Sequence, residues 1–77
     1  MPQLEIRAPM ACTVVEVSVA AGQSVRAGQT LAVIEAMKME HVLRAQVAGT
    51  VAVAVAVGES VARGQVLATV KTPAEDE

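Results

Sequence analysis

The stretch Gly22-Gln-Ser-Val-Arg-Ala-Gly-Gln-Thr-Leu31 returns 36 residues later as Gly58-Glu-Ser-Val-Ala-Arg-Gly-Gln-Val-Leu67. When the comparison is extended to residues 15–32 and 51–68, the two copies are identical at 11 of 18 positions, including both glycines and the Gly-Gln pair. Self-similarity at a fixed offset indicates that one supersecondary unit occurs twice. The chain of 77 residues therefore reads as one domain built from two copies of the same unit.

The composition favours a β-sheet core without aromatic side chains. There is no Phe, Tyr or Trp, and valine, which suits strands better than helices, occurs 15 times. The net charge of −2, with acidic and basic residues mixed along the chain, argues against a nucleic-acid or membrane-surface partner. The single cysteine cannot form an internal disulfide, and with one histidine it cannot complete a zinc site. The sequence predicts no signal peptide and no membrane span, so we expect a cytoplasmic, reducing location.

Hydrophobic alternation predicts strands in both copies. Valines alternate with polar residues over 15–19 and with alanines over 51–57, and each alternation ends at a glycine that marks a turn. Upstream of Val15 the offset between the copies becomes 37 residues, so the first copy carries one extra residue. We predict a β-bulge near residues 13–15 and none near residues 50–51.

Residues 31–45 show a conflict between local propensity and the repeat. They contain no Gly or Pro and are rich in helix formers, so taken alone they favour a helix. The repeat instead aligns the start of this stretch with residues 67–70, which carry β-branched side chains typical of strands. We therefore predict two strands, residues 31–36 and 39–45, joined by a tight turn at residues 37–38.

The expected fold is all-β. Two copies of about four short strands cannot each bury a face alone, so they must pack on each other as a flattened barrel or sandwich of two quasi-symmetric four-stranded halves. Shifted by the offset of 36 residues, Lys38 falls close to the two chain ends, so we expect it at a hairpin tip at the opposite end of the domain. Residues 1–72 form the predicted domain, and residues 73–77 are predicted to be a disordered acidic tail or the start of a linker.

The predicted turn breaks a local rule. Two-residue hairpins favour Asn-Gly or Gly-x because their central residues need positive φ, and holding Met37 and Lys38 there costs about 1–3 kcal/mol each. Broken local rules tend to mark functional sites. Lys38 is therefore the candidate functional residue, and a solvated lysine in a loosely defined turn is the alternative.

The sequence around this lysine is similar to a known family. Ala36-Met37-Lys38-Met39 resembles the biotin attachment motif of biotin carboxyl carrier domains. Ala8-Pro9-Met10 and Ala48-Gly49-Thr50-Val51 resemble the family's flanking segments, and the two Gly-Gln-x-Leu segments fit its internal symmetry. The resemblance extends over most of the chain, and it implies a flattened β-barrel with a modified lysine at a hairpin tip.

The resemblance implies a role for each residue at the tip. Lys38 carries biotin in a covalent amide, and Glu35 and Ala36 belong to the attachment motif. Met37 and Met39 flank the lysine and offer soft, adaptable apolar surface that partner enzymes recognise. Strand alternation predicts that at least one of the two methionines packs on the barrel.

The resemblance also implies partners and a mechanism. A biotin–protein ligase makes biotinyl-adenylate, and the Lys38 amine attacks its carbonyl; because an exposed lysine is protonated at neutral pH, the ligase must first remove the proton. The loaded arm then carries a carboxyl group from a biotin carboxylase to a carboxyltransferase of an acyl-CoA type carboxylase, and the domain itself is not an enzyme. A lipoyl carrier and an unmodified interaction module of the same fold are the alternatives. Lipoyl domains resemble Asp-Lys-Ala at the tip, whereas this chain has Met-Lys-Met.

Several neighbouring positions need separate interpretation. Cys12 stands where the second copy has Gly49, and the family commonly has glycine there, so we expect strain at Cys12 or a turn of another shape. His41 has no paired acid or nucleophile and is interpreted as an exposed strand residue rather than a catalytic one. Glu35 and Glu40 are interpreted as a solvated frame around the tip, with a recognition role as the alternative.

Overall fold

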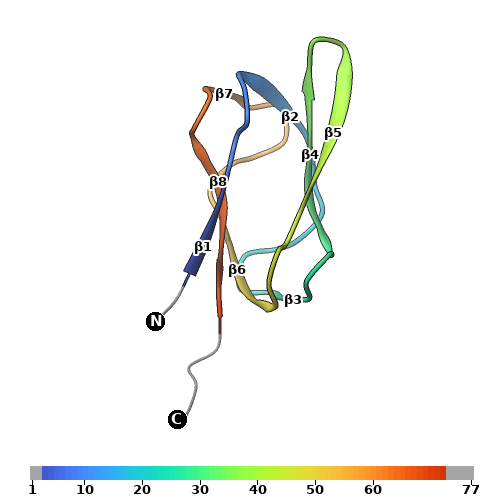
Figure 1. The fold of residues 1–77 in the computed structure, drawn as a ribbon. Coiled ribbons are helices and arrows are strands. Elements are labelled where there is room, and N and C mark those ends of the chain that lie inside the picture. The colour runs from blue at the N-terminus through green and yellow to red at the C-terminus, as the bar shows by residue number, and fades with distance from the viewer. Residues whose placement is uncertain (1–2, 73–77) are drawn as a thin grey trace.

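The computed structural model describes residues 3–72 of the chain, which contain eight strands joined by turns and loops, and no helix. They form two four-stranded antiparallel sheets (Figure 1). The strands are β1 (Gln3–Arg7), β2 (Cys12–Val17), β3 (Ser24–Val25), β4 (Thr30–Ala36), β5 (Met39–Arg44), β6 (Gly49–Val53), β7 (Ser60–Val61) and β8 (Val66–Lys71). The all-β prediction is confirmed, and the described residues contain no helix of the length and apolarity needed to cross a membrane. The predicted tail, residues 73–77, lies outside the described residues, and the division at residue 72 stays a prediction.

The two sheets are related by the repeat, but neither sheet is one half of the sequence. One sheet has the order β1-β8-β6-β3 and the other β5-β4-β2-β7, so each half of the chain contributes two strands to each sheet. Exchanging β1 with β5, β2 with β6, β3 with β7 and β4 with β8 converts one order into the other. The result is a flattened sandwich whose sheets do not close into one continuous barrel, and its two halves interlock.

The core shows the same interlocking at the level of side chains. The largest fully buried side chains form three pairs related by the repeat: Val14 with Val51, Leu31 with Leu67, and Ile34 with Val70. Each leucine packs in the cluster of the other half, because Leu67 lies with Val14 and Ile34 while Leu31 lies with Val51 and Val70. Neither half can therefore bury its own apolar face, as the sequence predicted.

The glycines of the repeat form four similar turns. Each turn has a glycine at its third position with φ between +85° and +92°, the geometry of a type II turn. The fourth residue, Gln or Glu, accepts a hydrogen bond through its side-chain oxygen from the backbone N–H of the first residue, at 3.0–3.2 Å. The Gly-Gln pairs recur because both residues close the same turn: Ala20–Gln23, Arg26–Gln29, Ala56–Glu59 and Ala62–Gln65.

Register confirms the predicted bulge and shows two more. Between β2 and β4 the pairing shifts at Val15, while β6 pairs with β8 without a shift. Two further shifts occur at Leu31 and Leu67, which are equivalent in the repeat, so no offset between the copies could indicate them. A bulge turns a strand locally and re-aims its side chains, and these two lie at the leucines that cross into the opposite cluster.

Close packing, and not backbone conformation, requires glycine at position 49. Neither Gly49 nor Cys12 has positive φ, so of the two expected outcomes strain at Cys12 does not occur. A Cβ at Gly49 would lie 2.2 Å from the carbonyl oxygen of Lys71 on β8. Cys12 itself is buried in the core, and burial raises the pKa of its thiol.

The stretch with helical propensity forms the β4–β5 hairpin. Its strands span Thr30–Ala36 and Met39–Arg44, within one residue of the predicted bounds. β4 is held on both sides, by β5 and by β2, and these pairings override the local preference for a helix. Figure 1 shows the hairpin extending beyond the rest of the molecule at one end, while β1 begins and β8 ends at the other. Lys38 is thus far from the start of β1 and the end of β8, as predicted.

Candidate functional site

A strained two-residue turn joins β4 to β5. Ala36 pairs with Met39, and Met37 and Lys38 between them have φ of 54° and 64°. Both central residues are thus in the left-handed region, as a type I′ turn requires, and among residues 3–72 they are the only non-glycine residues with positive φ. The four type II turns all use glycine where φ is positive, so the strain is confined to Met37 and Lys38.

The strands beneath the turn hold it firmly. Ile34 is fully buried and Ala36 is 7% exposed, so β4 is anchored in the core up to the residue before the turn. Thr13 of β2 pairs with Glu35, which extends the sheet on the side of β4 away from β5. The backbone that presents Lys38 is therefore rigid up to Ala36, and the turn itself projects into solvent.

Both methionines are exposed, which corrects the expectation that at least one would pack on the barrel. Met37 is 89% exposed and Met39 62%. Met39 lies directly across from the buried Ala36, but it belongs to β5, which is an edge strand of its sheet. Strand alternation predicts the face of a side chain correctly, yet burial also requires a second layer to cover that face.

Two carboxylates lie side by side below the turn. Glu35 and Glu40 are direct cross-strand partners and both are exposed. Like charges directly across a hairpin destabilise it, so this exposed pair of carboxylates lowers the stability of the hairpin slightly. His41 pairs with Ile34 and is half-buried, so the interpretation of His41 as an exposed residue is wrong. No group of three or more His, Cys, Asp or Glu side chains within residues 3–72 is placed to hold a metal ion.

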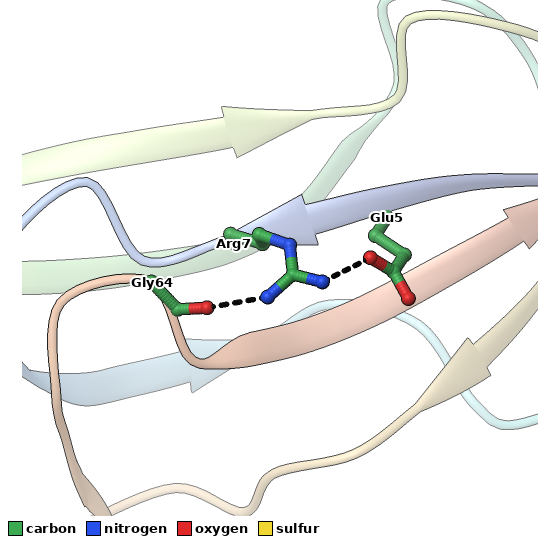
Figure 2. Close-up of polar contacts among 3 residues, drawn as sticks. All are labelled: Glu5, Arg7 and Gly64. Carbon is green, nitrogen blue, oxygen red and sulfur yellow. Dashed lines mark hydrogen bonds and ion pairs between the residues drawn. The ribbon is translucent and has the colours of Figure 1, made fainter.

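The lysine at the tip is free to react. Lys38 is exposed, and none of the hydrogen bonds or ion pairs found among residues 3–72 involves its amine. The arginines behave differently, because Arg7 donates to the carbonyl oxygen of Gly64 at 2.7 Å and forms an ion pair with Glu5 (Figure 2). A free primary amine on a rigid, projecting turn suits the formation of an amide with a carboxyl group brought by a second protein.

Sequence reasoning missed a groove between the edge strands β1 and β5. Its volume is about 250 Å³, and it is lined by Leu4, Glu5, Ile6, Arg7, Pro9, Val42, Leu43, Arg44 and Gln46. Arg44 donates to the carbonyl oxygen of Gly28 at 3.2 Å, the counterpart in the repeat of the bond from Arg7 to Gly64. These arginines hold turns in place, and the groove does not include the residues of the tip. No motif in the sequence signals it, because it depends on which strands lie at sheet edges.

Replacing the turn by a relaxed one should stabilise the domain. The double substitution Met37→Asn with Lys38→Gly places the preferred Asn-Gly pair on the observed backbone and is expected to raise the free energy of unfolding by about 1–2 kcal/mol. Urea denaturation followed by circular dichroism measures the change. Ala62→Gly, at an exposed position without positive φ, is the control and should lower stability by about 0.5–1 kcal/mol. A double variant no more stable than the parent would show that the turn stores no strain.

Comparison with known proteins gives consistent similarities. The family model described as "Biotin-requiring enzyme" (biotin/lipoyl) matches residues 4–70. Among curated proteins, the propionyl-CoA carboxylase alpha chain of Ruegeria pomeroyi is 54% identical over 44 residues, which are 57% of this chain and 6% of the relative. Mitochondrial pyruvate carboxylase of Mus musculus is 47% identical over 47 residues, 61% of this chain and 4% of the relative.

Solved structures of large carboxylases contain a similar domain. A single-chain, multi-domain long-chain acyl-CoA carboxylase matches with a TM-score of 0.75 and 39% identity over 91% of this chain and 7% of that one. The urea carboxylase of Kluyveromyces lactis matches with a TM-score of 0.82 and 26% identity, over 92% of this chain and 6% of that one. The chain thus spans less than a tenth of the length of these relatives.

Proposed function

This chain belongs to the family of biotin-requiring enzymes, in which the matching domain is a carrier of covalently attached biotin, and we propose that Lys38 is the residue that bears it. The observation that carries the proposal is the turn itself. Lys38 is exposed at a projecting tip, and the chain tolerates positive φ at this lysine, although Gly or Asn would relieve the strain. The two exposed methionines beside it are the flanking residues of the attachment motif.

The residues present fit the chemistry of loading. The Lys38 amine must lose a proton to a base of the ligase before it can attack. Its nitrogen then forms a bond to the carbonyl carbon of biotinyl-adenylate while the carbon–oxygen bond to the adenylate breaks, and the adenylate leaves. The product is a neutral amide on a long flexible side chain. No hydrogen bond or ion pair found among residues 3–72 involves the Lys38 amine, so attachment of biotin breaks none of these interactions.

The proposed role of the loaded domain is transport of a carboxyl group. Biotin supplies a ureido nitrogen that accepts and releases carbon dioxide. The described part of this chain contributes a base for the arm, held by β2 and β4, and a tip whose residues 37–40 are all exposed. We infer that a biotin carboxylase attaches a carboxyl group to the biotin. A carboxyltransferase of an acyl-CoA type carboxylase then removes that carboxyl group, in keeping with the names of the relatives. Tethering a carrier beside both sites raises its effective concentration over that of a free cofactor.

A lipoyl carrier is the second candidate because it shares the fold and the hairpin lysine. The discriminating observation is chemical: the side chains flanking Lys38 are two exposed thioethers, 89% and 62% accessible, and neither is a carboxylate. An unmodified interaction module is a weaker candidate, since it gives no reason for the strain at the turn.

Parallel loading reactions separate these candidates. The chain is incubated with ATP and either a biotin ligase with biotin or a lipoate ligase with lipoate, and intact mass is measured. We expect a biotinyl increment in the first reaction and none in the second. The variant Met37→Asp with Met39→Ala should load biotin at least tenfold more slowly. A lipoyl increment on the parent chain, or no increment with either ligase, would overturn the assignment.

A further inference from the structure

The sulfur-containing residues among residues 3–72 differ sharply in their exposure to solvent. Met37 and Met39 are 89% and 62% exposed. Met10 is half-buried and packs against a core cluster, and Cys12 is buried within the same cluster. Burial raises the pKa of the Cys12 thiol, which keeps the less reactive protonated form. Among the sulfur-containing side chains of residues 3–72, a small oxidant from solvent therefore meets the two tip methionines first.

No part of the described fold covers the side chains of Met37 and Met39 to any large extent. Met39 faces the side of the hairpin that carries Ala36, whose small side chain covers little of it. Glu35 and Glu40 lie on the opposite face, by strand alternation. The chain has no Phe, Tyr or Trp, so a contact between sulfur and one of these rings cannot form. The turn thus leaves both methionine side chains exposed.

We propose that Met37 and Met39 form a modification site for hydrogen peroxide, and that their oxidation to sulfoxide closes Lys38 to loading. The sulfur attacks one peroxide oxygen, the oxygen–oxygen bond breaks, and a sulfur–oxygen bond forms while the other oxygen leaves as water. Sulfur loses two electrons and peroxide gains them, so no further reagent is required. A methionine sulfoxide reductase returns the thioether by removing the oxygen as water, with two electrons and two protons supplied by a dithiol reductant that becomes a disulfide, so the modification is reversible.

The second half of this proposal rests on the proposed function. Oxidation converts an apolar, flexible side chain into one with a strong hydrogen-bond acceptor. Met37 and Met39 are the immediate neighbours of Lys38, so a ligase that closes over the amine must cover them as well. Burying a sulfoxide oxygen without a donor is unfavourable, and a tenfold or greater loss of loading rate is the expected consequence.

Peptide mapping tests the site itself, independently of any ligase. The folded chain is treated with limiting hydrogen peroxide, quenched with catalase and digested with trypsin, which leaves Met10, Met37 and Met39 on separate peptides. We expect the two tip methionines to gain one oxygen atom several-fold faster than Met10, and the difference to vanish in urea. Equal rates in the folded chain would overturn the proposed site.

Loading rates test the consequence. Biotin ligase, biotin and ATP are added to the untreated chain, to the oxidised chain and to the oxidised chain after treatment with sulfoxide reductases. We expect loading to fall at least tenfold on oxidation and to return after reduction. The variant Met37→Leu with Met39→Leu, whatever its own rate, should keep that rate through the same peroxide treatment. If the oxidised chain loads as fast as the untreated one, the inference fails alone, whereas an untreated chain that does not load refutes the proposed function and this consequence with it.

Discussion

Gly49→Ala is expected to lower the free energy of unfolding by about 3 kcal/mol or more, a large part of the roughly 4–12 kcal/mol that a domain of this size has. The new Cβ would stand 2.2 Å from the Lys71 carbonyl oxygen and 2.9 Å from Cγ1 of Val70. Both obstacles belong to β8, and one of them is backbone, which cannot turn aside as a surface side chain can. Relief requires β6 and β8 to move apart at the end where Thr50 pairs with Lys71.

The matched control is Gly22→Ala. Gly22 has φ of +86° but no atom within 4 Å of an added Cβ, so the variant suffers backbone strain of about 1–3 kcal/mol and no clash. Urea or thermal denaturation of both variants measures the difference. If Gly49→Ala proves no more destabilising than Gly22→Ala, the close packing of β6 on β8 at this point is not what requires glycine.

Exchanging two residues at the tip should abolish loading although the hairpin keeps a lysine. The double variant Met37→Lys with Lys38→Met moves the amine by one residue, and consecutive Cα atoms are about 3.8 Å apart. A misplacement of about 1 Å of a reacting group can cost a factor of about one hundred in rate, so we expect biotin ligase to load the exchanged chain at least a hundredfold more slowly. Intact mass followed over time measures the rate.

The exchange variant carries its own control of folding. Both turn positions keep side chains larger than glycine, so the strain at positive φ is conserved and stability should change little. A chain that unfolds at the same urea concentration as the parent but loads slowly shows that position decides the reaction. Loading at the parent's rate would mean that the ligase accepts any exposed lysine near the tip.

The topology and the tip could be predicted from sequence because the repeat carries long-range information. A helix was the local preference of residues 31–45, and the match of Leu31 with Leu67 overruled it correctly. The unequal offset placed the bulge at Val15, since an extra residue in one copy must be absorbed somewhere in its strand. The positive φ of Met37 and Lys38 followed from the length of the hairpin alone.

Other features depend on contacts that a repeat cannot report. Bulges at Leu31 and Leu67 occur in both copies, so they leave no trace in the alignment of one half with the other. The exposure of Met39 and the half-burial of His41 depend on how far side chains of other strands cover β5, which lies at the edge of its sheet. The reason for glycine at position 49 could not be predicted, because it depends on the close approach of β6 and β8.

The central claim is that the tip lysine, and no other amine, carries biotin. The chain has two lysines, and Lys71 is also exposed, in the last position of β8. The deciding measurement is the intact mass of the parent chain, Lys38→Arg and Lys71→Arg after incubation with biotin ligase, biotin and ATP. We predict one biotinyl increment on the parent and on Lys71→Arg, and none on Lys38→Arg. An increment that persists in Lys38→Arg, or disappears in Lys71→Arg, would contradict the account.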